Sequence, residues 1–133
     1  MIDKENEVFT RLREAILAEY SDASVTATYV NKPSSFPHVS IEQSDSYTPI
    51  QYVSSAWDEE YAQVMYTVNV YSNKVGTAKS EAKAIMKIVC DEMHHMNLFR
   101  ESLVPTPNEN SATVYRLTAR FEGIANADGF YSR

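Results

Sequence analysis

A strict alternation of apolar and mixed side chains over residues 62–71 constrains the fold more than any other feature of the sequence. Successive side chains of a β-strand point to opposite faces of a sheet, so this pattern predicts a strand with one apolar face. Such a strand needs neighbouring strands and a covering layer, because its apolar face has to be buried. The predicted apolar face consists of Ala62, Val64, Tyr66, Val68 and Val70.

Two amphipathic helices are predicted to provide the covering layer. The first extends over residues 3–20, with Asp3 as its expected N-cap, and the second over residues 77–97, with Thr77 as its cap. The second apolar stripe covers about 100° of the helix circumference, which is typical of a helix that packs on a core. The stripes consist of Val8, Leu12, Ala15 and Ile16 in the first helix, and of Ala78, Ala82, Ile85, Met86, Val89, Met93 and Met96 in the second.

Four further strands complete the predicted fold, at residues 25–29, 38–43, 99–104 and 113–122. In the last strand, apolar residues on one side alternate with a polar side that includes Arg116 and Arg120. This order of elements predicts a single α+β domain over residues 1–133, with a mostly antiparallel sheet of about five strands and both helices on one face. Residues 44–57 are expected to form a long loop, and residues 124–133 a short C-terminal tail.

The face of the predicted sheet that carries no helix has to meet solvent or another subunit. Val30, Met65, Tyr71 and Val114 fall on that side of their strands. Exposed apolar residues of this kind are typical of an interaction surface. The pattern therefore favours a partner bound to this face.

Composition excludes several classes of function. The three glycines are widely scattered, so the chain has no Gly-rich phosphate loop and no nucleophile elbow. The 12 basic and 18 acidic residues give a net charge of −6, which argues against a protein that grips a nucleic acid backbone. No apolar run has the length of a membrane span or the character of a signal segment, and a single cysteine excludes a disulfide framework. We expect a protein of a reducing compartment that binds no membrane and no specific nucleic acid sequence.

One helix carries residues that could bind a metal or a phosphate. Cys90 and His94 lie four residues apart, but two ligands make only half a zinc site, and neighbouring lysines oppose a cation. Those lysines, at positions 79, 83 and 87, could touch phosphate, although a solvated helix face explains them more simply. We therefore expect no metal and no cofactor.

An acidic run, Asp58, Glu59 and Glu60, lies in a stretch without lysine or arginine between Lys32 and Lys74. Paired carboxylates could serve acid and base catalysis, but adjacent side chains point apart, and no nucleophile is near in the sequence. A cysteine and histidine on one helix also lack an orienting third group. A solvated acidic edge is the favoured interpretation, and we expect no enzymatic activity.

Three segments of the chain share their order and spacing with one known protein family. Residues 33–42 (PSSFPHVSIE) are similar to a Pro-x-x-Phe-Pro-x-Val-x-Ile-Glu strand entry, and residues 68–73 (VNVYSN) to a central strand before an amphipathic helix. Residues 115–123 (YRLTARFEG) resemble a closing Arg-x-x-x-Arg-aromatic-Glu-Gly strand. Together, over about residues 2–131, they resemble the small tail-completion proteins of long-tailed bacteriophages and prophages.

The resemblance implies a tail terminator, which forms a ring, usually a hexamer, on the end of the tail tube. Such a ring stops tube polymerisation and offers a surface for head joining. The implied partners are further copies of the chain, the tail tube protein, and a head–tail connector or head-closure protein. The implied location is the virion tail or neck, after assembly in the host cytoplasm. The alternatives are another neck role such as head–tail joining or head closure, a small enzyme or ligand-binding domain, or a host adaptor of the same architecture.

A ring requires contacts between unlike surfaces of neighbouring subunits. The aromatic residues of the predicted loop, Tyr47, Tyr52 and Trp57, are of the kind that dominate interfaces. We further expect Arg116 and Arg120 to meet acids of a neighbouring subunit from the region 42–60, which includes Asp58 and Glu59. Pairing within the subunit, for instance with Glu101 or Glu122, is the competing hypothesis.

Overall fold

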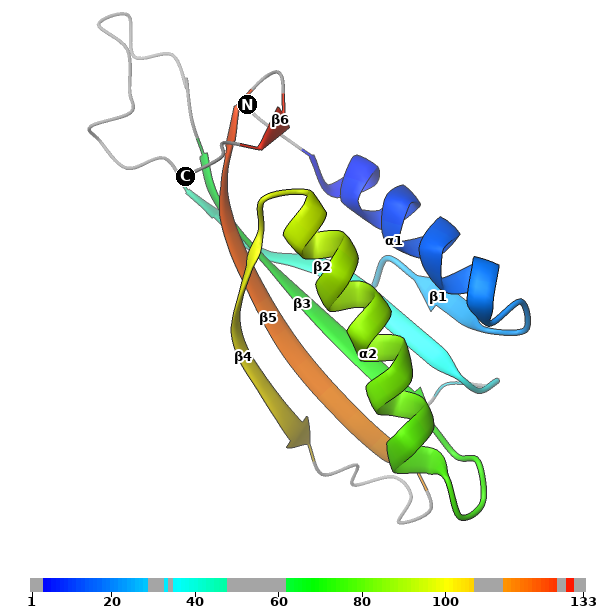
Figure 1. The fold of residues 1–133 in the computed structure, drawn as a ribbon. Helices are drawn as coiled ribbons and strands as arrows, with labels where there is room; N and C mark the ends of the chain where they lie inside the picture. The colour runs from blue at the N-terminus through cyan, green and yellow to red at the C-terminus, as the bar shows by residue number, and fades with distance from the viewer. Residues whose placement is uncertain are drawn as a thin grey trace, which may run out of the picture.

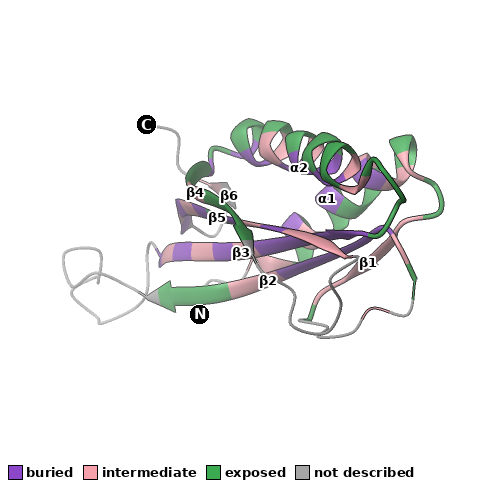
Figure 2. Cartoon of the chain, turned by 90° about the horizontal axis from the view of Figure 1, so that it is seen from below, coloured by how far each residue is buried: buried purple, intermediate pink, exposed green. Residues whose placement is uncertain are grey.

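The structure, a computed structural model, describes residues 4–28, 33, 35–47, 62–106, 114–126 and 129–130. Two helices lie side by side across one face of a twisted sheet, and Figure 2 shows both on the same side. This arrangement confirms the predicted α+β class and the placement of the helices. In chain order the elements are α1 (Glu5–Glu19), β1 (Ser24–Thr26), β2 (His38–Tyr47), β3 (Ala62–Ser72), α2 (Ala78–His95), β4 (Phe99–Thr106), β5 (Tyr115–Asn126) and β6 (Gly129–Phe130).

The strands follow the order β1-β2-β3-β5-β4, and the short β6 pairs with the end of β5 (Figure 1). All pairs are antiparallel except β1 and β2, which run parallel. The long strands β3 and β5 therefore form the centre of the sheet, while β4 and the short β1 form its edges.

The core lies between the helices and one face of the sheet, called here the inner face. In the first half of β3, buried residues alternate with half-buried ones, as the period of two predicts. Tyr66 of β3 is paired with Phe121 of β5, and both are almost fully buried. Each large apolar side chain removed from water in this layer contributes about 1.5–3 kcal/mol. The helices contribute Val8, Leu12, Ile16, Ala82, Ile85, Met86, Val89 and Met93 to it.

The helix boundaries differ from the prediction mainly at the caps. Lys4, rather than Asp3, is the N-cap residue of α1, and Asp3 lies outside the described residues. Thr77 is the N-cap residue of α2, as predicted, but its side chain makes no capping hydrogen bond. The structure instead ties the start of α2 to β3, because Ser72 Oγ donates to Glu81 Oε1 at 2.7 Å.

The end of α2 is closed by a backbone motif that directs the chain into β4. Asn97 has a φ of 65°, in the left-handed region that asparagine tolerates better than most residues. Its N–H donates to His94 O at 3.0 Å, and the Leu98 N–H donates to Met93 O at 2.9 Å. Leu98 then packs over Gly123, where a Cβ atom would collide with its Cδ2.

Three segments differ from their predicted form. β2 continues through Tyr47, four residues into the expected loop, with a bulge between Gln43 and Asp45. β5 continues to Asn126, and β6 folds back on it, so part of the expected tail belongs to the sheet. β1 is shorter than the predicted strand 25–29, although its pairing with β2 is confirmed. A bulge shifts the side-chain alternation by one residue, which hides a strand from a simple period of two.

Candidate assembly surface

The face of the sheet opposite the helices, called here the outer face, carries a connected group of polar and aromatic side chains. Asn69, in the middle of β3, accepts three hydrogen bonds at Oδ1. Two come from Nε and Nη2 of Arg116, at 3.1 and 3.0 Å, and one comes from Thr118 Oγ1 at 2.7 Å. The Arg116 guanidinium also lies 5.5 Å from the centre of the Tyr71 ring. A cation over an aromatic face is attracted by its quadrupole, so Tyr71 and Asn69 together hold this arginine in place.

Burial makes the hydrogen bonds of this group important for stability, because a polar atom left without a partner away from water destabilises the fold. Asn69 is 2% exposed and Tyr71 is 1% exposed. The sequence pattern correctly assigned Tyr71 to the outer face, but the expectation that it is an exposed apolar residue there was wrong. Met65 and Val114 are half-buried, and Val30 lies outside the described residues.

His38 extends the group toward the edge strand β1. Its ring lies 5.9 Å from the Tyr71 ring, and its Nε2 lies 3.3 Å from Thr26 Oγ1. Burial lowers the pKa of His38, because desolvation disfavours the charged imidazolium. The outer-face group, His38, Asn69, Tyr71, Arg116 and Thr118, thus spans β2, β3 and β5.

Arg120 differs from Arg116 although both point from β5 toward the outer face. Its cross-strand partners are Thr67 of β3 and Ser102 of β4, and its side chain is exposed. Within the described residues it forms no ion pair with Glu101 or Glu122. Glu122 instead accepts a hydrogen bond from Gln63 Nε2 at 2.7 Å. A charged side chain presented in this way remains available to a partner.

Exposed apolar residues gather on the edge strand β4, and Figure 2 shows the exposed colour on that strand. Phe99, Leu103 and Val104 are 42%, 36% and 51% exposed. Phe99 and Val104 are paired with Glu122 and Thr118 and so share the outer face with them. The sequence pattern predicted this strand but did not indicate that it exposes apolar side chains. The available signal was the adjacent pair Leu103 and Val104, which cannot both face the core of one sheet.

The opposite edge of the sheet is open along the second half of β2. Within the described residues, β1 pairs with β2 only at positions 38–40, and no strand lies beyond it. Ser44, Asp45 and Ser46 are exposed at the end of β2 (Figure 2). The Gln43 N–H donates to Glu5 Oε2 of α1 at 3.2 Å, rather than to a strand. The backbone N–H of Gln43 on this edge is therefore satisfied by a side chain of α1.

Most of the predicted interface residues lie outside the described residues: Tyr52, Trp57, Asp58 and Glu59 belong to the segment 48–61. Tyr47 is the last residue of β2, and its side chain is not described. The structure therefore places Arg116 and Arg120 but does not test whether they meet acids of a neighbour.

Of the residues considered for metal binding or catalysis, Cys90, His94 and His95 lie in the described part of the chain, whereas Asp58, Glu59 and Glu60 lie outside it. Burial raises the pKa of the Cys90 thiol, against a smaller opposing effect of the neighbouring Arg100, and a thiol with a raised pKa is a poor nucleophile. His94 and His95 are exposed in the last turn of α2. In the described part of the chain, no three potential ligands lie close enough to hold a metal ion. Neither described helix has the length and apolar character of a membrane span.

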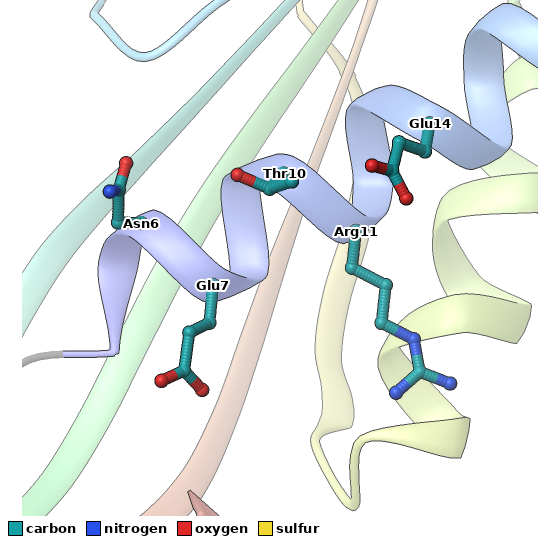
Figure 3. Close-up of a pocket in the computed structure, with 5 residues that line it drawn as sticks. All are labelled: Asn6, Glu7, Thr10, Arg11 and Glu14. Carbon is teal, nitrogen blue, oxygen red and sulfur yellow. The ribbon is translucent and has the colours of Figure 1, made fainter.

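A shallow hollow on α1 is lined by polar side chains of that helix alone. Figure 3 shows Asn6, Glu7, Thr10, Arg11 and Glu14 spread along one flank of the helix instead of converging on a point. Arg11 Nε already donates to Glu92 Oε2 of α2 at 2.9 Å. Ligand sites bury their ligand between several elements, so this hollow does not favour small-molecule binding.

The chain resembles solved structures but no protein family model. No family model and no curated protein matches the chain. Among solved structures, the chain is similar to the sheath/tube terminator of an extracellular contractile injection system, PVC, in the extended state. The TM-score is 0.38 at 12% sequence identity, over 90% of this chain and 56% of the other. The chain thus spans about half the length of that protein.

Proposed function

We propose that this protein is a structural subunit of a phage-like tail. Copies of it form a closed ring on the end of the tail tube, stop further polymerisation, and offer a surface for head joining. The ring, its usual number of six, and its partners come from the resemblance of residues 33–42, 68–73 and 115–123 to tail-completion proteins. The function is not enzymatic, and its location is the virion tail or neck.

The observation that carries the proposal is the pair of unlike open edges on one sheet. β4 presents exposed apolar residues, while β2 carries the half-buried Glu42 and the exposed Asp45. A ring needs a contact between two different surfaces of the same subunit, repeated by rotation until it closes. A symmetric patch, by comparison, would give only a dimer.

The segment 48–61 is proposed to contribute to the same contact. Tyr52 and Trp57, together with Tyr47, would supply aromatic contacts, and Asp58 and Glu59 would supply negative charge. Hydrogen exchange on free and assembled protein tests this assignment. The proposal requires that protection of the segment increases on assembly, and equal protection in both states contradicts it.

Electron microscopy of tail tubes tests the function directly. Tube protein is polymerised with and without the purified chain, and tube lengths and tube ends are compared. We expect shorter tubes that carry a ring at one end, and a ring mass that is a whole multiple of 15.1 kDa. Val104→Lys should abolish the effect, whereas Val75→Lys, at a still more exposed valine in the turn after β3, should not. Unlimited tube growth with the wild-type chain refutes the proposed function.

A further inference from the structure

One flank of α2 concentrates positive charge in a chain whose net charge is −6. Lys79, Lys83 and Lys87 repeat every four residues, so they lie above one another on the helix, and all three are exposed. Like charges at this spacing repel each other. In the described part of the chain none of them forms an ion pair, not even with Asp91, one turn after Lys87. This charge is therefore available to an acidic partner.

The flank with the lysines lies over the edge strand β4 and faces away from α1. The opposite flank of α2 meets α1 through the ion pair of Glu92 with Arg11. Cys90, seven residues after Lys83 and on the same flank, interacts with Arg100 of β4. Arg100 is exposed, so it adds a fourth positive charge to this side of the subunit.

Leu103 of β4 gives the charged flank an apolar centre. It pairs with the buried Ala119 and so points toward the helices, yet it is 36% exposed, because α2 leaves part of this edge uncovered. The register places it about 7 Å along β4 from Arg100, which equals the rise of about five residues of α2. Because β4 runs back along α2 (Figure 1), Leu103 lies beside the stretch from Lys83 to Lys87. The basic flank is defined as Lys79, Lys83, Lys87, Arg100 and Leu103.

The longest run of acids in the sequence has the complementary chemistry. Residues 57–61 read Trp-Asp-Glu-Glu-Tyr and lie outside the described residues. Three carboxylates suit a row of lysines, while aromatic rings on either side suit an apolar centre and adjacent cations. No lysine or arginine occurs between Lys32 and Lys74, so the acids of the run have no basic neighbour in the sequence.

Covalent geometry keeps this run away from the basic flank of its own subunit. Asp58 precedes Ala62 by four residues, so their Cα atoms are at most about 14 Å apart. Leu103 lies two strands across from Val68, which is six residues along β3 from Ala62. Ala62 and Leu103 are therefore about 22 Å apart. Lys83 is farther still, because α2 runs antiparallel to β3 (Figure 1). A second copy has to supply the acids that cover it.

We propose that the basic flank of one subunit binds residues 57–61 of a second copy of this chain, with Asp58, Glu59 and Glu60 against the lysines and the aromatic rings against Leu103. The contact rests on the proposed function, because it joins neighbouring copies in the ring. It goes beyond that function in assigning the lysines of α2 and the acidic run to each other. The two surfaces are unlike, so the contact is head-to-tail and repeats by rotation.

A carbodiimide cross-linker tests the contact in the unaltered protein. It activates a carboxylate, and an amine in contact with that carboxylate then forms an amide, while the carbodiimide takes up the water and becomes a urea. Equal amounts of ordinary and isotopically labelled chains are mixed, concentrated or bound to tube ends, cross-linked and digested. We expect mass spectrometry to find Lys83 or Lys87 joined to residues 58–60, with one peptide ordinary and the other labelled.

Three outcomes of cross-linking overturn the proposal. Links between the basic flank and residues 58–60 that occur only within one chain place the run on its own subunit. The absence of such links shows that the two surfaces do not meet. Equal linking of Lys74, an exposed lysine in the turn after β3, shows that the run binds lysines without selection.

Charge reversal tests the same contact by sedimentation. Lys83→Glu should raise the concentration needed for half-maximal assembly by about tenfold, because one attraction becomes a repulsion. Glu59→Lys on the same chain should recover most of that loss, and loss without recovery contradicts the contact. Lys74→Glu is the matched control and should leave assembly unchanged.

The tube assay separates this inference from the proposed function. Links between chains together with unlimited tube growth show that the contact is right and the terminator function is wrong. Capped tubes without such links show that the chain ends tubes through a different subunit contact. Links between chains together with capped tubes support both.

Discussion

Replacing Asn69 by alanine tests whether the outer-face group stabilises the subunit. The change removes the acceptor of two N–H groups of Arg116 and of the Thr118 hydroxyl. The two arginine contacts share one oxygen, so they count as one charge-assisted hydrogen bond of about 1.5–3 kcal/mol, and the threonine adds about 1 kcal/mol. Because Arg116 is only half-buried, water recovers part of this loss. We expect the free energy of unfolding to fall by about 2–3 kcal/mol.

Urea unfolding followed by circular dichroism measures this loss. The midpoint should fall while the slope m stays constant, because the surface exposed on unfolding hardly changes. Asn73→Ala, at an exposed residue of the turn after β3, is the matched control and should change stability by less than about 0.5 kcal/mol. If Asn69→Ala costs no more than Asn73→Ala, the outer-face group does not stabilise the fold and the reasoning is refuted.

Three further predictions follow from single residues. Gly123→Ala should cost about 1–3 kcal/mol in urea unfolding, because its Cβ would collide with Leu98; an unchanged midpoint contradicts this packing. Burial lowers the pKa of His38 below its ordinary 6.5, so the unfolded chain takes up the proton more readily and the free energy of unfolding should fall as the pH drops below about 6.5. His38→Asn should weaken that pH dependence, and an identical pH profile would exclude His38 as its cause. Arg120→Glu should weaken self-association in sedimentation experiments, and unchanged association would show that Arg120 does not bind a neighbouring subunit.

The sheet and its helices could be predicted because their patterns are local. The alternation over 62–71 fixes which side of β3 faces the core, and the stripe of α2 matches it with a period of 3.6. The burial of Val64, Tyr66 and Val68 confirms that prediction in full. The burial of these residues requires a layer to pack against, but it does not depend on any particular residue of a distant segment.

What could not be predicted depends on register and on neighbouring strands. The bulge at Gln43 interrupts the alternation, so β2 looked like a strand followed by loop. The pattern also predicted that β1 and β2 pair, but alternation within a strand does not indicate the direction in which the strand runs, and the two are parallel. The burial of Tyr71 depends on Arg116 and His38, which are far from it in the sequence and join it only through the pairing of three strands.

The two arginines of β5 show that the alternation of a strand predicts which face a side chain points to, but not what that side chain binds. Arg116 and Arg120 are four residues apart in one strand and therefore point the same way. The register places Arg116 opposite Tyr71, and Asn69 lies two residues before Tyr71 on the same face of β3. The guanidinium of Arg116 therefore binds these two residues within the subunit. The same register places Arg120 between Thr67 and Ser102, two small side chains that cannot compensate its charge. If one of the pair reaches across to a neighbouring subunit, the physical argument therefore selects Arg120.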